Sequence, residues 1–151
     1  MQIRQIHKII VPIDFLEHTD QLLEYGGYIA KTMGAALHCI HVITTPQKYA
    51  GYEVPSLSSL DREMLEIAKE QMQALIDQNR RTLPNWEGKV LKGDIVDTII
   101  EYAQEEEGDL IIIGTHGRKG LSKMWLGSVA ERVIKRAPCP TLSCNPYKPV
   151  E

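Results

Sequence analysis

The sequence predicts an α/β fold, an open parallel sheet of five strands with helices on both faces. Short apolar runs alternate with longer segments of helical periodicity, and this alternation is typical of parallel α/β sheets. Residues 110–113 form a continuous apolar run, as expected of a strand that is buried on both faces. The chain has 151 residues, which suits a single domain, 1–151, with a real hydrophobic core.

Five runs have the character of strands: residues 8–13, 36–43, 89–91, 110–113 and 141–144. The helical segment after the first run ends at Gly34, a typical C-terminal stop. Its predicted buried face carries Leu22, Gly26, Ile29, Ala30 and Met33. A longer second helix has similar spacing, and we expect its apolar face, methionines included, to pack in the core. That face carries Leu57, Leu60, Met64, Ile67, Ala68, Met72 and Leu75.

Residues 44–56 contain proline and glycine, show no periodicity, and are predicted to form a loop. The loop follows a strand, so it lies on the rim where open α/β sheets bind ligands. It is either a lid over a bound ligand or an ordinary connection between two elements.

The segment after residue 113 has the chemistry of a phosphate-binding loop. It carries Gly114, Gly117 and Gly127, several basic residues, and then Ser128 at the start of a predicted helix over 128–136. Ser128 and Glu131 have capping-box spacing, in which each side chain bonds a backbone N–H at the helix start. Glycines, positive charge and a helix N-terminus together attract anions such as phosphate. The alternative is an ordinary loop in which Ser128 only caps its helix.

The spacing Gly114-x2-Gly117-x9-Gly127-Ser128 resembles the G-x2-G-x9-G-[ST] motif of ATP-binding universal stress proteins. Neither the P-loop pattern nor G-x-G-x-x-G occurs. Residues 8–14, 40–42, 93–95 and 137–142 also resemble family landmarks, in the family's order. One departure is that Phe15 and Leu16 stand where family members often carry a small hydroxyl residue, which argues against an extra polar contact from this turn.

The resemblance implies a Rossmann-like universal stress protein fold that binds ATP, with Mg²⁺ or Mn²⁺ as candidate companion ions. Matching positions on the nucleoside side are Pro12, Ile13, Asp14 and Val42. Matching or adjacent positions on the phosphate side are Gly114, Thr115, His116, Gly117, Arg118, Gly127, Ser128 and Val129. The Asp14 carboxylate can accept from an adenine amino group or ribose hydroxyls, or help to hold a metal. The alternative is that Asp14 caps its loop or the next helix.

Composition and the remaining motifs exclude several classes of function. The formal charge of −3 argues against a nucleic-acid-binding surface. We expect no signal peptide or membrane span, and a cytoplasmic protein with three reduced cysteines. His38 and His41 would point to opposite faces of a strand, so they cannot share a zinc ion.

The last predicted strand, Thr141–Cys144, lies at a sheet edge, and edges expose unpaired backbone groups. The resemblance implies a homodimer formed through this strand; the alternative is an edge blunted by Pro138, Pro140 and Pro146.

Three functions remain open: a dimeric nucleotide-dependent switch in stress response or signalling with an unknown protein partner, a slow ATPase or phosphotransferase, and a nucleotide-free interaction module. We assign no catalytic residue and expect at most weak ATP hydrolysis.

Overall fold

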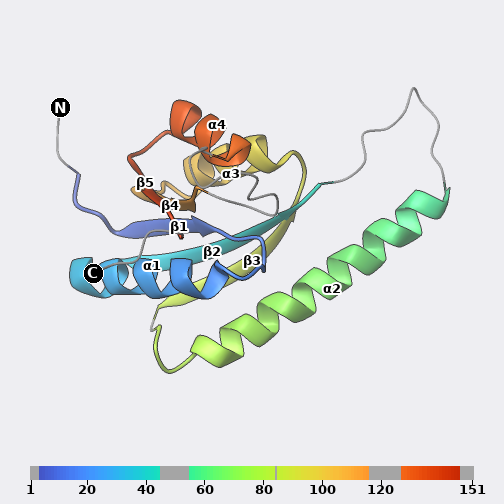
Figure 1. The fold of residues 1–151 in the computed structure, drawn as a ribbon, viewed down its shortest axis with the longest axis horizontal. Helices are drawn as coiled ribbons and strands as arrows, with labels where there is room; N and C mark the ends of the chain where they lie inside the picture. The colour runs from blue at the N-terminus through green and yellow to red at the C-terminus, as the bar shows by residue number, and fades with distance from the viewer. Residues whose placement is uncertain (1–3, 45–54, 84, 116–126, 147–151) are drawn as a thin grey trace.

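The computed structural model describes residues 4–44, 55–83, 85–115 and 127–146. Within them the chain forms a five-stranded parallel sheet, in the order β3-β2-β1-β4-β5, and four helices (Figure 1), which confirms the predicted fold class. The strands are β1 (Lys8–Pro12), β2 (Ala36–Ile43), β3 (Trp86–Lys92), β4 (Leu110–Gly114) and β5 (Thr141–Cys144). The helices are α1 (Thr19–Met33), α2 (Pro55–Asn79), α3 (Ile95–Glu105) and α4 (Ser128–Arg136).

Each face of the sheet is covered by two helices and has its own hydrophobic core. Helices α1 and α2 pack on a core that includes Ile9, Leu37 and Ile112. Helices α3 and α4 pack on the opposite core, which includes Ile10 and Ile111. Neighbouring residues of β1 therefore point to opposite faces, and the strand is buried on both, as its apolar sequence predicts.

Local sequence signals set the ends of α1 and α3. Gly34 follows α1 with φ 65°, in the left-handed region that glycine adopts without strain, and this confirms the predicted stop. Asp94 caps α3, because its side-chain oxygen accepts a hydrogen bond from the Asp97 N–H at 2.9 Å.

The predicted capping box at the start of α4 is wrong. The N-cap residue is Gly127 rather than Ser128, since the Glu131 N–H donates to the Gly127 carbonyl at 3.0 Å. The Glu131 carboxylate accepts instead from Lys135 Nζ at 2.9 Å, one turn further along the helix. With Gly127 as the N-cap residue, a glutamate of a capping box would have to accept from the Gly127 N–H. That N–H already donates to the Thr115 carbonyl.

The prediction for α2 holds only for its second half. Ala68, Met72 and Leu75 are buried on the sheet, whereas Leu60, Met64 and Ile67 are each at least 50 % exposed. Figure 1 shows the reason: the first half of α2 extends beyond the strands that its second half covers. On α1 the predicted core residue Met33 is likewise exposed, because it is the last residue of the helix.

The predicted loop 44–56 ends earlier than expected. Pro55 is the first residue of α2, a position that proline favours because the N–H it lacks has no helical acceptor there. Residues 45–54, on which the lid hypothesis depends, lie outside the described residues.

Candidate functional site

The candidate site lies at the carboxyl ends of β1 and β4, where the direction of chain winding reverses. From β1 the chain adds β2 and β3 on one side, and it then returns to place β4 and β5 on the other side. Because the neighbouring strands are parallel, the segments that follow β1 and β4 leave the same edge of the sheet. Such a switch point is where open α/β sheets bind ligands.

The turn after β1 presents an exposed carboxylate at this edge. Asp14 Oδ1 accepts a hydrogen bond from the Leu16 N–H at 2.9 Å, so the side chain closes its own turn. The cap residue of α1 is His18, and Asp14 therefore does not cap that helix. A carboxylate has about four acceptor positions, so Asp14 keeps acceptor capacity for a ligand.

Phe15 and His41 fix the backbone of the same turn, a role that the sequence patterns did not indicate. Phe15 has φ 61°, which is rare for a bulky residue, and its ring centroid lies 4.4 Å from that of His41. His41 Nδ1 lies 2.8 Å from the Ile13 carbonyl oxygen, and the Ile13 N–H donates to the Ile40 carbonyl. The turn that carries Asp14 is thus anchored to β2 at three points.

The structure does not bring all the predicted nucleoside-side residues onto one wall. Ile13 is buried in the core under α1 and α2, whereas Val42 is buried in the core under α3 and α4. Their side chains therefore face opposite sides of the sheet. Only their backbone groups, and not both side chains, can contact the same face of a bound base. Pro12 is half-buried at the end of β1.

On the phosphate side, Thr115 joins the two ends of the glycine-bearing segment. Its N–H and Oγ1 donate to the Cys144 carbonyl, at 2.9 and 3.2 Å, which fastens the end of β4 to β5. Its own carbonyl accepts from the Gly127 N–H at 2.6 Å. Gly114, Thr115 and Gly127 are therefore held together, whereas the predicted site residues His116, Gly117 and Arg118 lie outside the described residues.

The N-terminus of α4 offers backbone donors at this point. The first-turn N–H groups, at Ser128, Val129 and Ala130, have no acceptor within the helix, and no side chain in the described part of the chain caps it. Ser128 is exposed, Val129 is half-buried against the core, and Ala130 is buried. The helix dipole adds partial positive charge to these donors, so the arrangement suits a phosphate or another anion.

Among the described residues, the histidines and cysteines are not grouped for metal binding. His38 contacts Tyr102 of α3, and His41 contacts Phe15 on the other face, so the prediction that they face opposite sides is confirmed. Burial raises the pKa of the Cys39 thiol to about 12 and also raises those of Cys139 and Cys144. Within the described parts of the chain, no three His, Cys, Asp or Glu side chains are grouped to hold a metal ion.

A nucleotide fits these groups better than a protein-held metal does. Asp14 is a single carboxylate, and Mg²⁺ is commonly held by one or two carboxylates together with substrate phosphates and water. Any ion at this site would therefore depend on the nucleotide for most of its ligands. None of the helices that the structure describes is both long and apolar enough to cross a membrane.

Comparison with known proteins agrees with this architecture. The chain is 33 % identical over 139 residues to universal stress protein MJ0531 of Methanocaldococcus jannaschii, covering 89 % of this chain and 79 % of that protein. The solved structure of MJ0577, also from M. jannaschii, superposes with a TM-score of 0.80 at 25 % identity, covering 97 % of this chain and 100 % of that one.

A more distant structure of the same fold contains a nucleotide. The universal stress protein from Archaeoglobus fulgidus in complex with dAMP superposes with a TM-score of 0.67 at 20 % identity, covering 93 % of this chain and 98 % of that one. The model of the universal stress protein family matches residues 5–144, which include every strand and helix described above. The chain therefore belongs to the universal stress protein family.

Proposed function

We propose that this protein binds ATP at the carboxyl ends of β1 and β4 and acts as a dimeric, nucleotide-dependent switch in the cytoplasm during stress. The observation that carries the proposal is the N-terminus of α4, whose first-turn N–H groups have no side-chain cap among the described residues and are tied through Gly127 to the end of β4. A phosphate chain supplies the acceptors that these donors lack. The dAMP complex of the A. fulgidus protein supports an adenine nucleotide as the ligand class.

In this proposal the two sides of the site bind different parts of the nucleotide. Asp14 accepts from ribose hydroxyls or from the adenine amino group, and the backbone of Pro12, Ile13 and Val42 borders the base. Gly114, Thr115, Gly127, Ser128 and Val129 bind the phosphates, together with His116, Gly117 and Arg118. In the alternative role for Asp14, its carboxylate would help to hold a Mg²⁺ or Mn²⁺ ion, which would offset the negative charge of the phosphates.

The proposed dimer forms through β5. This strand pairs with β4 on one side, and its other edge has no strand beside it in the described sheet. A β-strand of a second copy would pair with the backbone groups on this free edge. Sedimentation at micromolar protein checks this: a monomer mass contradicts the dimer.

Calorimetric titration with ATP tests the binding proposal, with Asp14→Asn as the decisive variant. Asparagine keeps the oxygen that accepts from Leu16 and removes the charge, so the turn should stay folded while affinity falls about tenfold. Asp61→Asn on α2 is the matched control and should bind as the parent protein does. If Asp14→Asn binds ATP unchanged, the assignment of Asp14 is wrong.

Nucleotide released from denatured, freshly purified protein distinguishes the switch from an enzyme. ATP in near-stoichiometric amount supports a binding switch, and ADP accompanied by turnover that Asp14→Ala abolishes supports hydrolysis. Protein that carries no nucleotide and does not bind added ATP contradicts both.

A further inference from the structure

One face of α2 remains available for a partner. Residues Leu60, Met64, Ile67, Gln71, Ala74 and Gln78 follow one another at alternating intervals of four and three and so form one stripe, which we call the α2 stripe. Its first three members are large apolar side chains that are 52 %, 50 % and 50 % exposed. The buried residues of the helix, Ala68, Met72 and Leu75, lie on the adjacent face against the sheet.

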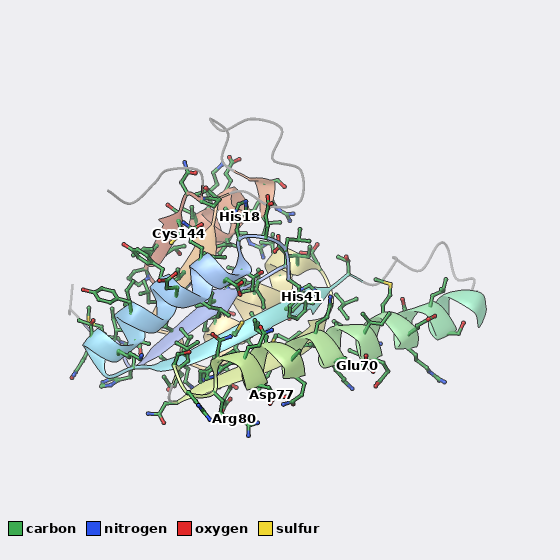
Figure 2. All side chains as sticks on the ribbon, turned by 60° about the horizontal axis from the view of Figure 1, so that its bottom comes forward. His18, His41, Glu70, Asp77, Arg80 and Cys144 are labelled. Carbon is green, nitrogen blue, oxygen red and sulfur yellow. The ribbon has the colours of Figure 1, made fainter. Side chains whose placement is uncertain are left out.

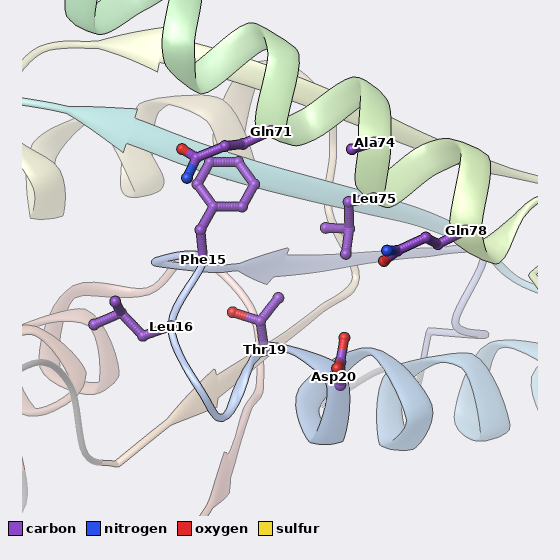
Figure 3. A pocket seen from close by; sticks show the side chains of 8 residues that line it. All are labelled: Phe15, Leu16, Thr19, Asp20, Gln71, Ala74, Leu75 and Gln78. Carbon is purple, nitrogen blue, oxygen red and sulfur yellow. The ribbon is translucent and has the colours of Figure 1, made fainter.

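The second half of the α2 stripe faces a hollow beside α1. Gln71, Ala74 and Gln78 line this hollow of about 240 Å³ from one side, and the N-terminus of α1 and the turn before it line the other side (Figure 3). Thr19, at the start of α1, is only 5 % exposed, and its hydroxyl oxygen has no hydrogen-bond partner among the described residues. The exposed apolar stripe thus leads into a hollow whose lining includes both apolar and polar side chains.

The charge beside the stripe defines the chemistry of a partner. Glu63, Glu70 and Asp77 are spaced seven residues apart, and each directly precedes a stripe residue, so they form an acidic flank along its outer edge. All three are exposed, and Figure 2 shows Glu70 and Asp77 on the side of α2 away from the sheet. Neither Glu63 nor Glu70 forms an ion pair within the described residues. The hollow adds another carboxylate, that of Asp20.

The acidic flank argues against a second copy of this chain as the occupant. When two α2 helices pair antiparallel about a two-fold axis, each places its acidic flank against that of the other. Like charges at these flanking positions oppose pairing. Along the second half of α2 the opposite flank is covered by the sheet, through Ala68, Met72 and Leu75.

We propose that the α2 stripe and its acidic flank bind an amphipathic helix of another protein, one whose apolar face is bordered by Lys or Arg. Leu60, Met64 and Ile67 have the spacing by which helices dock on one another, and the carboxylates fix the orientation and steer the encounter. The surface is separate from the α4 N-terminus, and its hollow borders the turn of Phe15 and Leu16 that follows Asp14.

Two synthetic helical peptides of 18 residues test this surface in the full-length protein. Both carry leucine at heptad core positions; one has lysine at the flanking positions and the other has glutamate. Fluorescence anisotropy should show that the lysine peptide binds and that its affinity falls as salt is raised. The affinity of the glutamate peptide should be lower than that of the lysine peptide by about tenfold or more. Equal binding of the two peptides, or binding of neither, overturns the proposal.

Matched variants locate the surface. Ile67→Asp should weaken binding of the lysine peptide about tenfold or more, whereas Ile134→Asp, at an exposed isoleucine of α4, should not. Glu63→Lys with Glu70→Lys should reverse the preference between the two peptides, and Glu101→Lys on α3 serves as the charge control. Both isoleucines are exposed, so circular dichroism should show folded variants.

Sedimentation of Ile67→Asp checks self-association: loss of a parent dimer would assign the surface to a second copy and contradict the proposal.

Discussion

The Nδ1 atom of His38 lies 2.8 Å from the hydroxyl oxygen of Tyr102, where β2 packs against α3. Both side chains are buried, and burial is the main cause that lowers the pKa of His38 below 6.5. Lys8 and Lys89 lower this pKa further, while Glu87 and Glu106 oppose the shift. The lowered pKa of His38 favours the neutral imidazole in the folded protein.

This pair predicts a loss of stability in weak acid. The unfolded chain binds a proton at His38 near pH 6.5 and the folded chain only at lower pH, so the free energy of unfolding falls as the pH drops below 6.5. Urea unfolding of the parent protein at pH 7.5 and 5.5 should show this fall, and His38→Gln should reduce it. An equal fall in the variant would assign the effect to other groups.

Cys39 is predicted to be the least reactive of the three cysteines. It is fully buried, and burial raises its thiol pKa to about 12, so almost no thiolate is present at pH 8. Mass mapping after treatment with a thiol reagent should show modification of the half-buried Cys139 and Cys144 first, and of Cys39 only on unfolding. Rapid modification of Cys39 in the folded protein would contradict this.

Gly108→Ala is predicted to destabilise the core beneath α3. An added Cβ would lie 2.5 Å from Cδ1 of Ile10, which is fully buried and cannot move aside freely. Overpacking of this kind costs about 1–3 kcal/mol of unfolding free energy. Gly34→Ala is the control, because its Cβ meets no atom within 4 Å and only its φ of 65° adds strain. Equal unfolding curves for Gly108→Ala and the parent protein would refute the predicted clash.

Asp94→Ala and Ser128→Ala distinguish a real helix cap from the wrongly predicted one. Removing the Asp94 cap should cost about 1 kcal/mol of unfolding free energy, and Asp94→Asn should restore most of it. Ser128→Ala should change stability by less than about 0.5 kcal/mol, since its side chain does not cap α4. Chemical unfolding measures both variants. A large loss of unfolding free energy in Ser128→Ala would show that the Ser128 side chain does cap α4.

The ends of several elements could be predicted because local signals set them. Gly34 ends α1 and Pro55 begins α2 through conformational preferences of single residues, although only the first was predicted. The third strand was predicted as residues 89–91 but runs from Trp86 to Lys92. It lies at the edge of the sheet and alternates exposed with half-buried residues, so its apolar signal is weak at both ends.

The alternation of strands and helices, the buried strands and the glycine spacing around Gly114 and Gly127 could be read from the sequence, since these depend on residues near one another in the chain. The N-cap of α4, which is Gly127 rather than Ser128, depends on a contact between distant segments, because the Thr115 carbonyl already holds the Gly127 N–H. The tertiary structure also places Ile13 and Val42 in opposite cores and leaves half of the α2 face exposed. Periodicity shows that a helix has an apolar face, but how far the sheet extends beneath that face depends on strands distant in sequence.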